Sequence, residues 1–79
     1  MDWQQWITRD PTVMQGKPVL RGTRITVEHV LERMGEGWSE RDLIASYPHL
    51  KPEHIRAALA FAAQALASDE LLFMEGDAA

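Results

Sequence analysis

The fold is decided by residues 26–67, which read TVEHVLERMGEGWSERDLIASYPHLKPEHIRAALAFAAQALA. At the start of this stretch, apolar residues recur at the i, i+3, i+4 and i+7 spacing of one helical face, namely Val27, Val30, Leu31 and Met34. Thr26 is suited to cap the N-terminus of this helix, and Gly35 or Gly37 is suited to end it. The pattern predicts a helix near residues 27–36.

Two further helices are predicted from their start signals. Ser39 and Asp42 have the spacing of a capping box, which predicts a short helix near residues 40–46, ended by the proline that follows. Pro52 suits the first position of a third helix near residues 52–67. We expect two apolar stripes along it, an inner one of Ile55, Leu59, Ala62 and Leu66 and a second one of Ala58, Phe61 and Ala65. A helix that is apolar on most sides is usually buried on most sides, which indicates a partner chain against it.

Residues 1–26 carry β-leaning residues between proline and glycine breaks. Short strands are expected at residues 6–8, 12–14 and 19–21. Strands this short must lie on the rest of the domain or pair across a dimer. We therefore predict a mainly α domain over residues 1–68, with an N-terminal β-hairpin followed by three helices.

The composition limits how such a chain is stabilised. The chain has 79 residues, enough for one domain. Below roughly 80 residues a core rarely supplies more than about 3–5 kcal/mol, and small domains add disulfides, a metal or a partner subunit. Because cysteine is absent, a disulfide is excluded and a structural zinc site is disfavoured. A homodimer is the expected solution.

The charge is unevenly distributed. Eight Lys and Arg against twelve Asp and Glu give a formal net charge of −4. The whole deficit lies after Leu66, in the carboxylates of Asp69, Glu70, Glu75 and Asp77. We treat residues 69–79 as an acidic-apolar tail, in which Leu71, Leu72, Phe73 and Met74 either continue the third helix or bind a partner's groove. Its carboxylates suit a basic surface such as the cleft of a ribonuclease.

Several classes of protein are disfavoured. No secretory signal is visible, and no apolar run approaches the roughly 20 residues of a membrane span, so we expect a cytoplasmic protein that does not enter the membrane. No phosphate loop, nucleophile elbow or metal-ligand motif occurs. We expect no enzyme, and hence no catalytic residue, cofactor or metal. His49 and His54 are expected at solvent or groove positions.

The order of short helix, tight turn and longer helix resembles a helix-turn-helix, whose last helix places its N-terminal residues in the major groove of DNA. The candidate DNA-binding residues are Lys17, Arg21, Lys51, His54 and Arg56. The alternatives are that the helices simply pack together and that the basic residues form a solvated face. For Arg24 we favour a structural role, with Glu28 or Glu32 as its acidic partner.

A longer motif carries a family resemblance. It consists of Asp10-Pro11, Gly16-Lys17-Pro18-Val19-Leu20-Arg21-Gly22-Thr23-Arg24-Ile25-x-Val27, Gly37-x-Ser39, Tyr47-Pro48-x-Leu50 and Ile55-x-Ala57-Ala58-Leu59. Over about residues 7–67 the chain resembles the bacterial family known as domain of unknown function 433, which includes VapB-like antitoxins. The resemblance implies a homeodomain-like helix-turn-helix behind a small hairpin. One departure is Lys51, which stands where similar sequences place Thr or Ser as the cap of the third helix, so this helix is expected to begin frayed.

The resemblance also implies a function. It indicates the antitoxin of a type II toxin-antitoxin pair, a dimer that neutralises a PIN-like ribonuclease toxin and binds the operator DNA of its own operon. The alternative is a homodimeric protein-interaction module that does not bind DNA. A steep salt dependence of DNA affinity would distinguish the first from the second.

Overall fold

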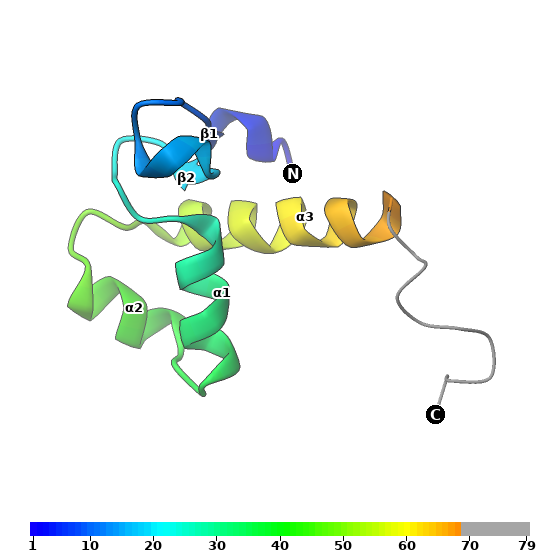
Figure 1. The fold of residues 1–79 in the computed structure, drawn as a ribbon. Coiled ribbons are helices and arrows are strands. Elements are labelled where there is room, and N and C mark those ends of the chain that lie inside the picture. Colours follow the sequence, from blue (N-terminus) through cyan, green and yellow to red (C-terminus); the bar gives the residue numbers. More distant parts are fainter. Residues whose placement is uncertain (69–79) are drawn as a thin grey trace, which may run out of the picture.

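A short hairpin followed by three helices makes up the computed structural model, which describes residues 1–68 (Figure 1). In chain order the elements are the 3-10 turn η1 (Trp3–Gln5), strand β1 (Ile7–Thr8), the 3-10 turn η2 (Met14–Gly16), strand β2 (Val19–Leu20), and helices α1 (Val27–Gly35), α2 (Glu40–Ser46) and α3 (Pro52–Ser68). The mainly helical architecture with an N-terminal hairpin is confirmed. The tail residues Leu71, Leu72, Phe73 and Met74 lie outside the described residues.

Helix α1 begins and ends at the expected signals. The Oγ1 atom of Thr26 accepts a hydrogen bond from the backbone N–H of His29 at 2.9 Å. Beyond the C-terminus, Gly37 has φ of +102°, and its N–H donates to the carbonyl of Met34. The N–H of Trp38 donates to the carbonyl of Arg33, which completes a Schellman motif. The left-handed residue lets the chain reverse direction into α2.

The start of α2 is a complete capping box. Ser39 Oγ accepts from the N–H of Asp42 at 3.1 Å, and Asp42 Oδ2 accepts from the N–H of Ser39 at 2.8 Å. The hydrogen bond from the Ser39 backbone is the main cause that lowers the pKa of Asp42 below its ordinary value of 3.8. The predicted cap is confirmed.

Helix α3 is capped in a way that the sequence did not suggest. Its third residue, His54, accepts a hydrogen bond at Nδ1 from the backbone N–H of Lys51 at 3.0 Å. This bond is the half of a capping box in which the third residue satisfies the cap residue's amide. This bond satisfies the amide of Lys51 itself, whereas the missing hydroxyl would accept from an amide inside the helix, so the frayed start expected at Lys51 stays a prediction.

The hairpin has two strands. Ile7 pairs with Leu20 and Thr8 with Val19 in antiparallel register. The third strand expected at residues 12–14 does not form. Asp10 Oδ1 accepts from both the N–H and the hydroxyl of Thr12, at 2.9 and 2.7 Å, which folds the chain into an Asx turn. The left-handed residues Met14, Gln15 and Gly16 then turn it back toward β2.

The family motif shapes the loop between β2 and α1. Gly22 has φ of +85°, which the turn from Leu20 to Thr23 requires. The hydroxyl of Thr23 donates to the Leu20 carbonyl at 2.8 Å and accepts from the N–H of Ile25 at 3.0 Å. The carbonyl of Pro18 accepts from the N–H of Val27 at 3.0 Å. The motif residues therefore fix the path of the backbone from the hairpin into α1.

The core lies between the hairpin and the inner faces of the three helices. Its fully buried side chains include Leu20, Val30, Leu43 and Ile55. The inner face of α3 consists of His54, Ile55, Ala57 and Ala58. The expected inner stripe is wrong in two places, because Leu59 and Leu66 are 46% and 59% exposed. The core meets only the first half of α3, whose second half extends past α1 and α2 (Figure 1).

The N-terminal turn η1 packs along α3. The rings of Trp3 and Phe61 meet edge to face with centroids 4.9 Å apart. Trp3 Nε1 also donates to Oε1 of Gln64 at 2.8 Å. These contacts join the beginning of the chain to the middle of its last described helix.

Among residues 1–68, none of the helices has the length and apolar character needed to span a bilayer.

Candidate functional site

The loop after β2 meets the start of α3 through a buried histidine. His54 is 4% exposed, and its Nε2 lies 3.0 Å from the carbonyl oxygen of Arg21. Because Nδ1 accepts the Lys51 amide, the ring proton is on Nε2, which donates to Arg21. The indole of Trp6 packs edge to face on the imidazole, with centroids 5.2 Å apart. The imidazole thus ties η1, the loop and α3 together.

A surface hollow of about 280 Å³ opens at this junction. Its walls include Gln5, Trp6, Arg21, His49, Lys51 and His54. The structure therefore brings three of the five candidate DNA-binding residues to one place, Arg21, Lys51 and His54. Arg21 and Lys51 are exposed there, so their charges are available to an anion.

His54 itself cannot serve as a contact in this arrangement. Both ring nitrogens are used inside the protein, and the side chain is nearly inaccessible. The expectation of a solvent or groove position for His54 is wrong, because the fold uses the ring as a buried polar link. His49, in contrast, is exposed as expected.

Arg21 combines a structural role with an exposed charge. Its guanidinium donates to the carbonyls of Gln5, Gln4 and Ile7 at 3.0, 3.2 and 3.3 Å. These bonds satisfy carbonyls at the end of η1 and the start of β1. The residue therefore holds η1 against the hairpin while its positive charge remains beside Lys51.

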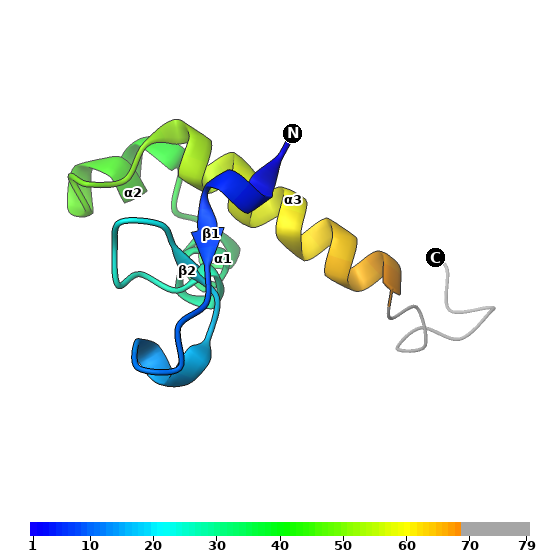
Figure 2. The same ribbon diagram turned by 90° about the horizontal axis from the view of Figure 1, so that it is seen from above.

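Lys17 lies apart from the other candidates. Its Nζ forms an ion pair with Glu28 Oε1 at 3.2 Å, at the start of α1. In the hairpin register, Lys17 lies beyond the Thr8–Val19 pair, whereas Arg21 lies beyond the opposite pair. Figure 2 shows the loop of residues 9–17 at the end of the hairpin remote from the start of α3. Lys17 does not share a surface with Lys51.

Arg24 and Arg56 are both exposed. Within residues 1–68, no hydrogen bond or ion pair joins Arg24 to Glu28 or Glu32, so the structural role favoured for Arg24 is wrong. Lys17, not Arg24, pairs with the carboxylate of Glu28. Arg24 directly follows Thr23, which lines the hollow, but Arg24 itself is not among the lining residues.

The body of the protein is electrically balanced. Residues 1–68 contain eight Lys and Arg and eight Asp and Glu, so their formal charges cancel. Two of the cations, Arg21 and Lys51, line the hollow, and Glu53 at the start of α3 is the acidic residue nearest to Lys51 in sequence. No group of three potential metal ligands converges within this part of the chain.

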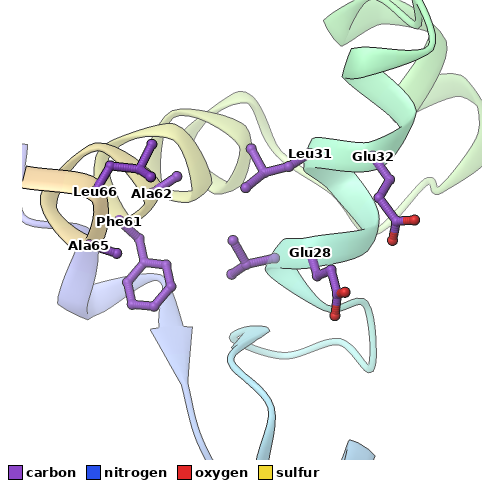
Figure 3. A pocket seen from close by; sticks show the side chains of 8 residues that line it. Glu28, Leu31, Glu32, Phe61, Ala62, Ala65 and Leu66 are labelled. Atoms are coloured by element: carbon purple, nitrogen blue, oxygen red, sulfur yellow. The ribbon is translucent and has the colours of Figure 1, made fainter. Parts of the chain in front are cut away.

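A second surface feature is an apolar groove of about 520 Å³ between α1 and α3. Its lining comprises Val27 and Leu31 from α1 and Phe61, Ala62, Ala65 and Leu66 from α3. Leu31 reaches toward α3, whereas the carboxylates of Glu28 and Glu32 point away from it (Figure 3). The sequence indicated surplus apolar surface on α3 but not that α1 supplies the opposite wall. In the sequence, the small side chains of Ala62 and Ala65 were the feature that could have indicated this groove.

Comparison with known proteins identifies the family. The family model of a protein of unknown function (DUF433) matches residues 7–62. The uncharacterized protein y4eO of Sinorhizobium fredii is 36% identical over 56 residues, which cover 71% of this chain and 25% of y4eO. The crystal structure of a DUF433 member protein from Anabaena variabilis has a TM-score of 0.75 and 30% identity, covering 85% of this chain and 66% of that one. The chain thus spans only a quarter of the length of y4eO and about two thirds of the solved chain, yet the family match covers most of its own residues and includes the whole hairpin, α1 and α2. It belongs to the DUF433 family.

Proposed function

We propose that this chain is the antitoxin of a bacterial type II toxin-antitoxin pair, which binds its operator DNA as a dimer and neutralises a PIN-like ribonuclease in the cytoplasm. In this proposal α2, the turn of residues 47–51 and α3 form a homeodomain-like helix-turn-helix. The start of α3 enters the major groove of the operator.

The observation that carries the DNA-binding part is the bond between His54 and the Arg21 carbonyl. It holds the loop after β2 beside the N-terminus of the helix that would read DNA. Arg21 and Lys51 line the hollow there, where a helix N-terminus also attracts phosphate. In a dimer this group of cations would be present twice, which doubles the phosphate contacts.

The proposed DNA contacts are those candidates that are exposed near the start of α3. Lys51 and Arg56 contact DNA from the start of α3, and Arg21 contributes from the loop after β2. Lys17 is left out because it pairs with Glu28 at the other end of the hairpin. His54 is left out because it is buried.

The antitoxin part is supported by the family resemblance and by the acidic residues after Ser68. Four carboxylates in residues 69–79 match the charge that the RNA-binding cleft of a ribonuclease would attract. In this proposal Leu71, Leu72, Phe73 and Met74 bind the toxin. Co-expression with the protein encoded next to it, followed by co-purification and a ribonuclease assay, tests this part. A neighbour that neither binds nor cleaves RNA would contradict it.

DNA binding is tested by fluorescence anisotropy with the DNA that precedes the gene of this chain, over a series of salt concentrations. The wild-type affinity should fall steeply with salt. Lys51→Ala and Arg56→Ala each remove one cation from a phosphate, so each should lower the affinity and reduce the salt slope by about 1. Arg9→Ala is the matched control, because Arg9 is an exposed cation in the loop remote from α3. Equal effects of all three variants would contradict the proposed surface.

A second candidate is a homodimeric protein-interaction module that does not bind DNA. The observations that favour it are the balanced charge of residues 1–68 and the apolar groove between α1 and α3. This candidate predicts that DNA affinity is weak for every sequence, including the DNA preceding the gene, and that Lys51→Ala leaves it unchanged. The anisotropy series above separates the two candidates.

A further inference from the structure

Within the described residues, Trp3 contacts one side of the second half of α3 through Phe61 and Gln64, and the side that faces the groove is left open. Every residue from Ala63 to Ser68 is exposed, and the segment from Leu59 to Ser68 contains no charged residue. An isolated helix of this length is marginal in water, because most helical stability comes from packing of an apolar face. The two exposed leucines of α3 are also not scattered over its surface, because Leu59 and Leu66 lie seven residues apart and therefore on one face of the helix.

This half of α3 forms one wall of the groove described above. Val27 and Leu31 form the other wall. Phe61 lines the groove from the α3 side (Figure 3). Glu28 and Glu32 stand at the outer rim on the α1 side. An occupant must therefore be apolar and must tolerate the carboxylate of Glu32 and that of Glu28, the latter paired with Lys17.

Charge distinguishes the possible occupants. The chain's own residues 69–79 contain apolar side chains, but their four carboxylates would meet the carboxylate of Glu32 at the rim, where Glu28 is already paired with Lys17. Like charges in such proximity oppose binding. The uncharged segment 59–68 of a second copy meets the same rim without repulsion, and its alanines allow two helices to approach closely.

We propose that the groove between α1 and α3 is a two-fold interface, in which the segment 59–68 of each copy packs into the groove of the other. Such an interface is isologous, so Leu66 is at once part of the groove of one copy and an inserted side chain for the other. The proposal rests on the dimeric state in the proposed function and assigns its contact surface. It is independent of DNA and toxin binding.

The first experiment is sedimentation equilibrium of the full chain over a wide range of concentrations. The wild type should be a dimer, and Leu66→Glu should raise its dissociation constant roughly tenfold or more. Ala67→Glu is the matched control, because Ala67 is exposed on the same helix but does not line the groove. Circular dichroism should show that both variants retain the wild-type helix content, since neither side chain is in the core.

A second measurement uses the absence of cysteine from the chain. Single variants Ala65→Cys and Ala67→Cys place a thiol in the groove and on the opposite side of α3. The reaction rate of Ala65→Cys with a maleimide should fall as protein concentration rises and the dimer forms, while that of Ala67→Cys should not change.

Two outcomes would overturn the proposal in distinguishable ways. If the wild type stays monomeric, both this interface and the dimer of the proposed function are excluded. The groove is then left to residues 69–79 or to another protein. If the wild type is a dimer but Leu66→Glu does not weaken it, and Ala65→Cys is not protected from the maleimide, only this interface is excluded. The dimer then forms through another surface such as the hairpin.

Discussion

His54 Nε2 and the carbonyl oxygen of Arg21 are joined by a 3.0 Å hydrogen bond across 33 positions of sequence. The other ring nitrogen caps α3 by accepting the Lys51 amide. One buried side chain therefore starts a helix and holds the preceding loop against it. The cations around the hollow owe their common location to this link.

His54→Ala should lower the free energy of unfolding by about 1–3 kcal/mol. The change leaves the Arg21 carbonyl and the Lys51 amide without their partners, and because both hydrogen bonds are only partly buried, the two losses together should cost about as much as one fully buried group, about 1–3 kcal/mol. Urea unfolding monitored by circular dichroism measures the change. His49→Ala is the control, because His49 is exposed and its loss should stay within about 0.5 kcal/mol. Similar losses for both variants would show that the bonds of His54 do not contribute.

The two glycines at the end of α1 should respond with opposite signs to substitution by alanine. A Cβ at either position meets nothing within 4 Å, so packing is not involved. Gly37 has φ of +102°, and Gly37→Ala should cost about 1 kcal/mol from the left-handed backbone alone. Gly35 ends α1 without a positive φ, and Gly35→Ala should gain about 0.5 kcal/mol. Two losses of equal size in thermal unfolding would contradict the assigned Schellman motif.

Ser39→Ala should destabilise the protein by about 1 kcal/mol, because the N–H of Asp42 loses its partner at the start of α2. Ser46→Ala provides a matched control at the exposed other end of the same helix, with an expected change within about 0.5 kcal/mol. Chemical unfolding of both variants beside the wild type is the measurement. If Ser39→Ala were as neutral as its control, the capping box would be without energetic effect.

Stability should fall as the solution is acidified below about pH 5. The pKa of Asp42 is lowered below 3.8 in the folded state, first by the Ser39 backbone bond, and that of Asp10 is lowered by the Thr12 backbone bond. A carboxyl with a lowered folded pKa contributes stability that is present above its unfolded pKa and is lost as pH falls through the folded value. Urea midpoints measured over a pH series should show this, and the decline should be shallower for Asp42→Asn. An unchanged slope in that variant would exclude Asp42 as a source.

The parts of the fold that depend on neighbouring residues were predictable from the sequence. The hydroxyls of Thr26 and Ser39 accept hydrogen bonds from amides three residues away. These caps can therefore be predicted from the local sequence, and the starts of α1 and α2 follow from them. The exposed leucines of α3 show the limit of periodicity. Leu59 and Leu66 have helical spacing, but the core is too small to reach the face on which they lie.

The parts that depend on distant residues were not predictable. From the sequence, His54 was expected at a solvent position. Its acceptor is the backbone carbonyl of Arg21, and because every residue has a backbone carbonyl, the sequence does not indicate this hydrogen bond. Likewise, Arg24 is close enough in sequence to pair with Glu28, but the hairpin register places Lys17 there instead. For the candidate site, the residue types were visible, but which of them share a surface followed only from the fold.

The contacts of Trp3 with Phe61 and Gln64 have a consequence for how the chain is made. A ribosome releases the N-terminal turn and the hairpin before the helix that covers them. Trp6 has no partner until His54 has left the exit tunnel, and Trp3 has none until Phe61 and Gln64 have followed. The nascent hairpin therefore exposes apolar side chains until α3 has been synthesised, and only then can the fold close.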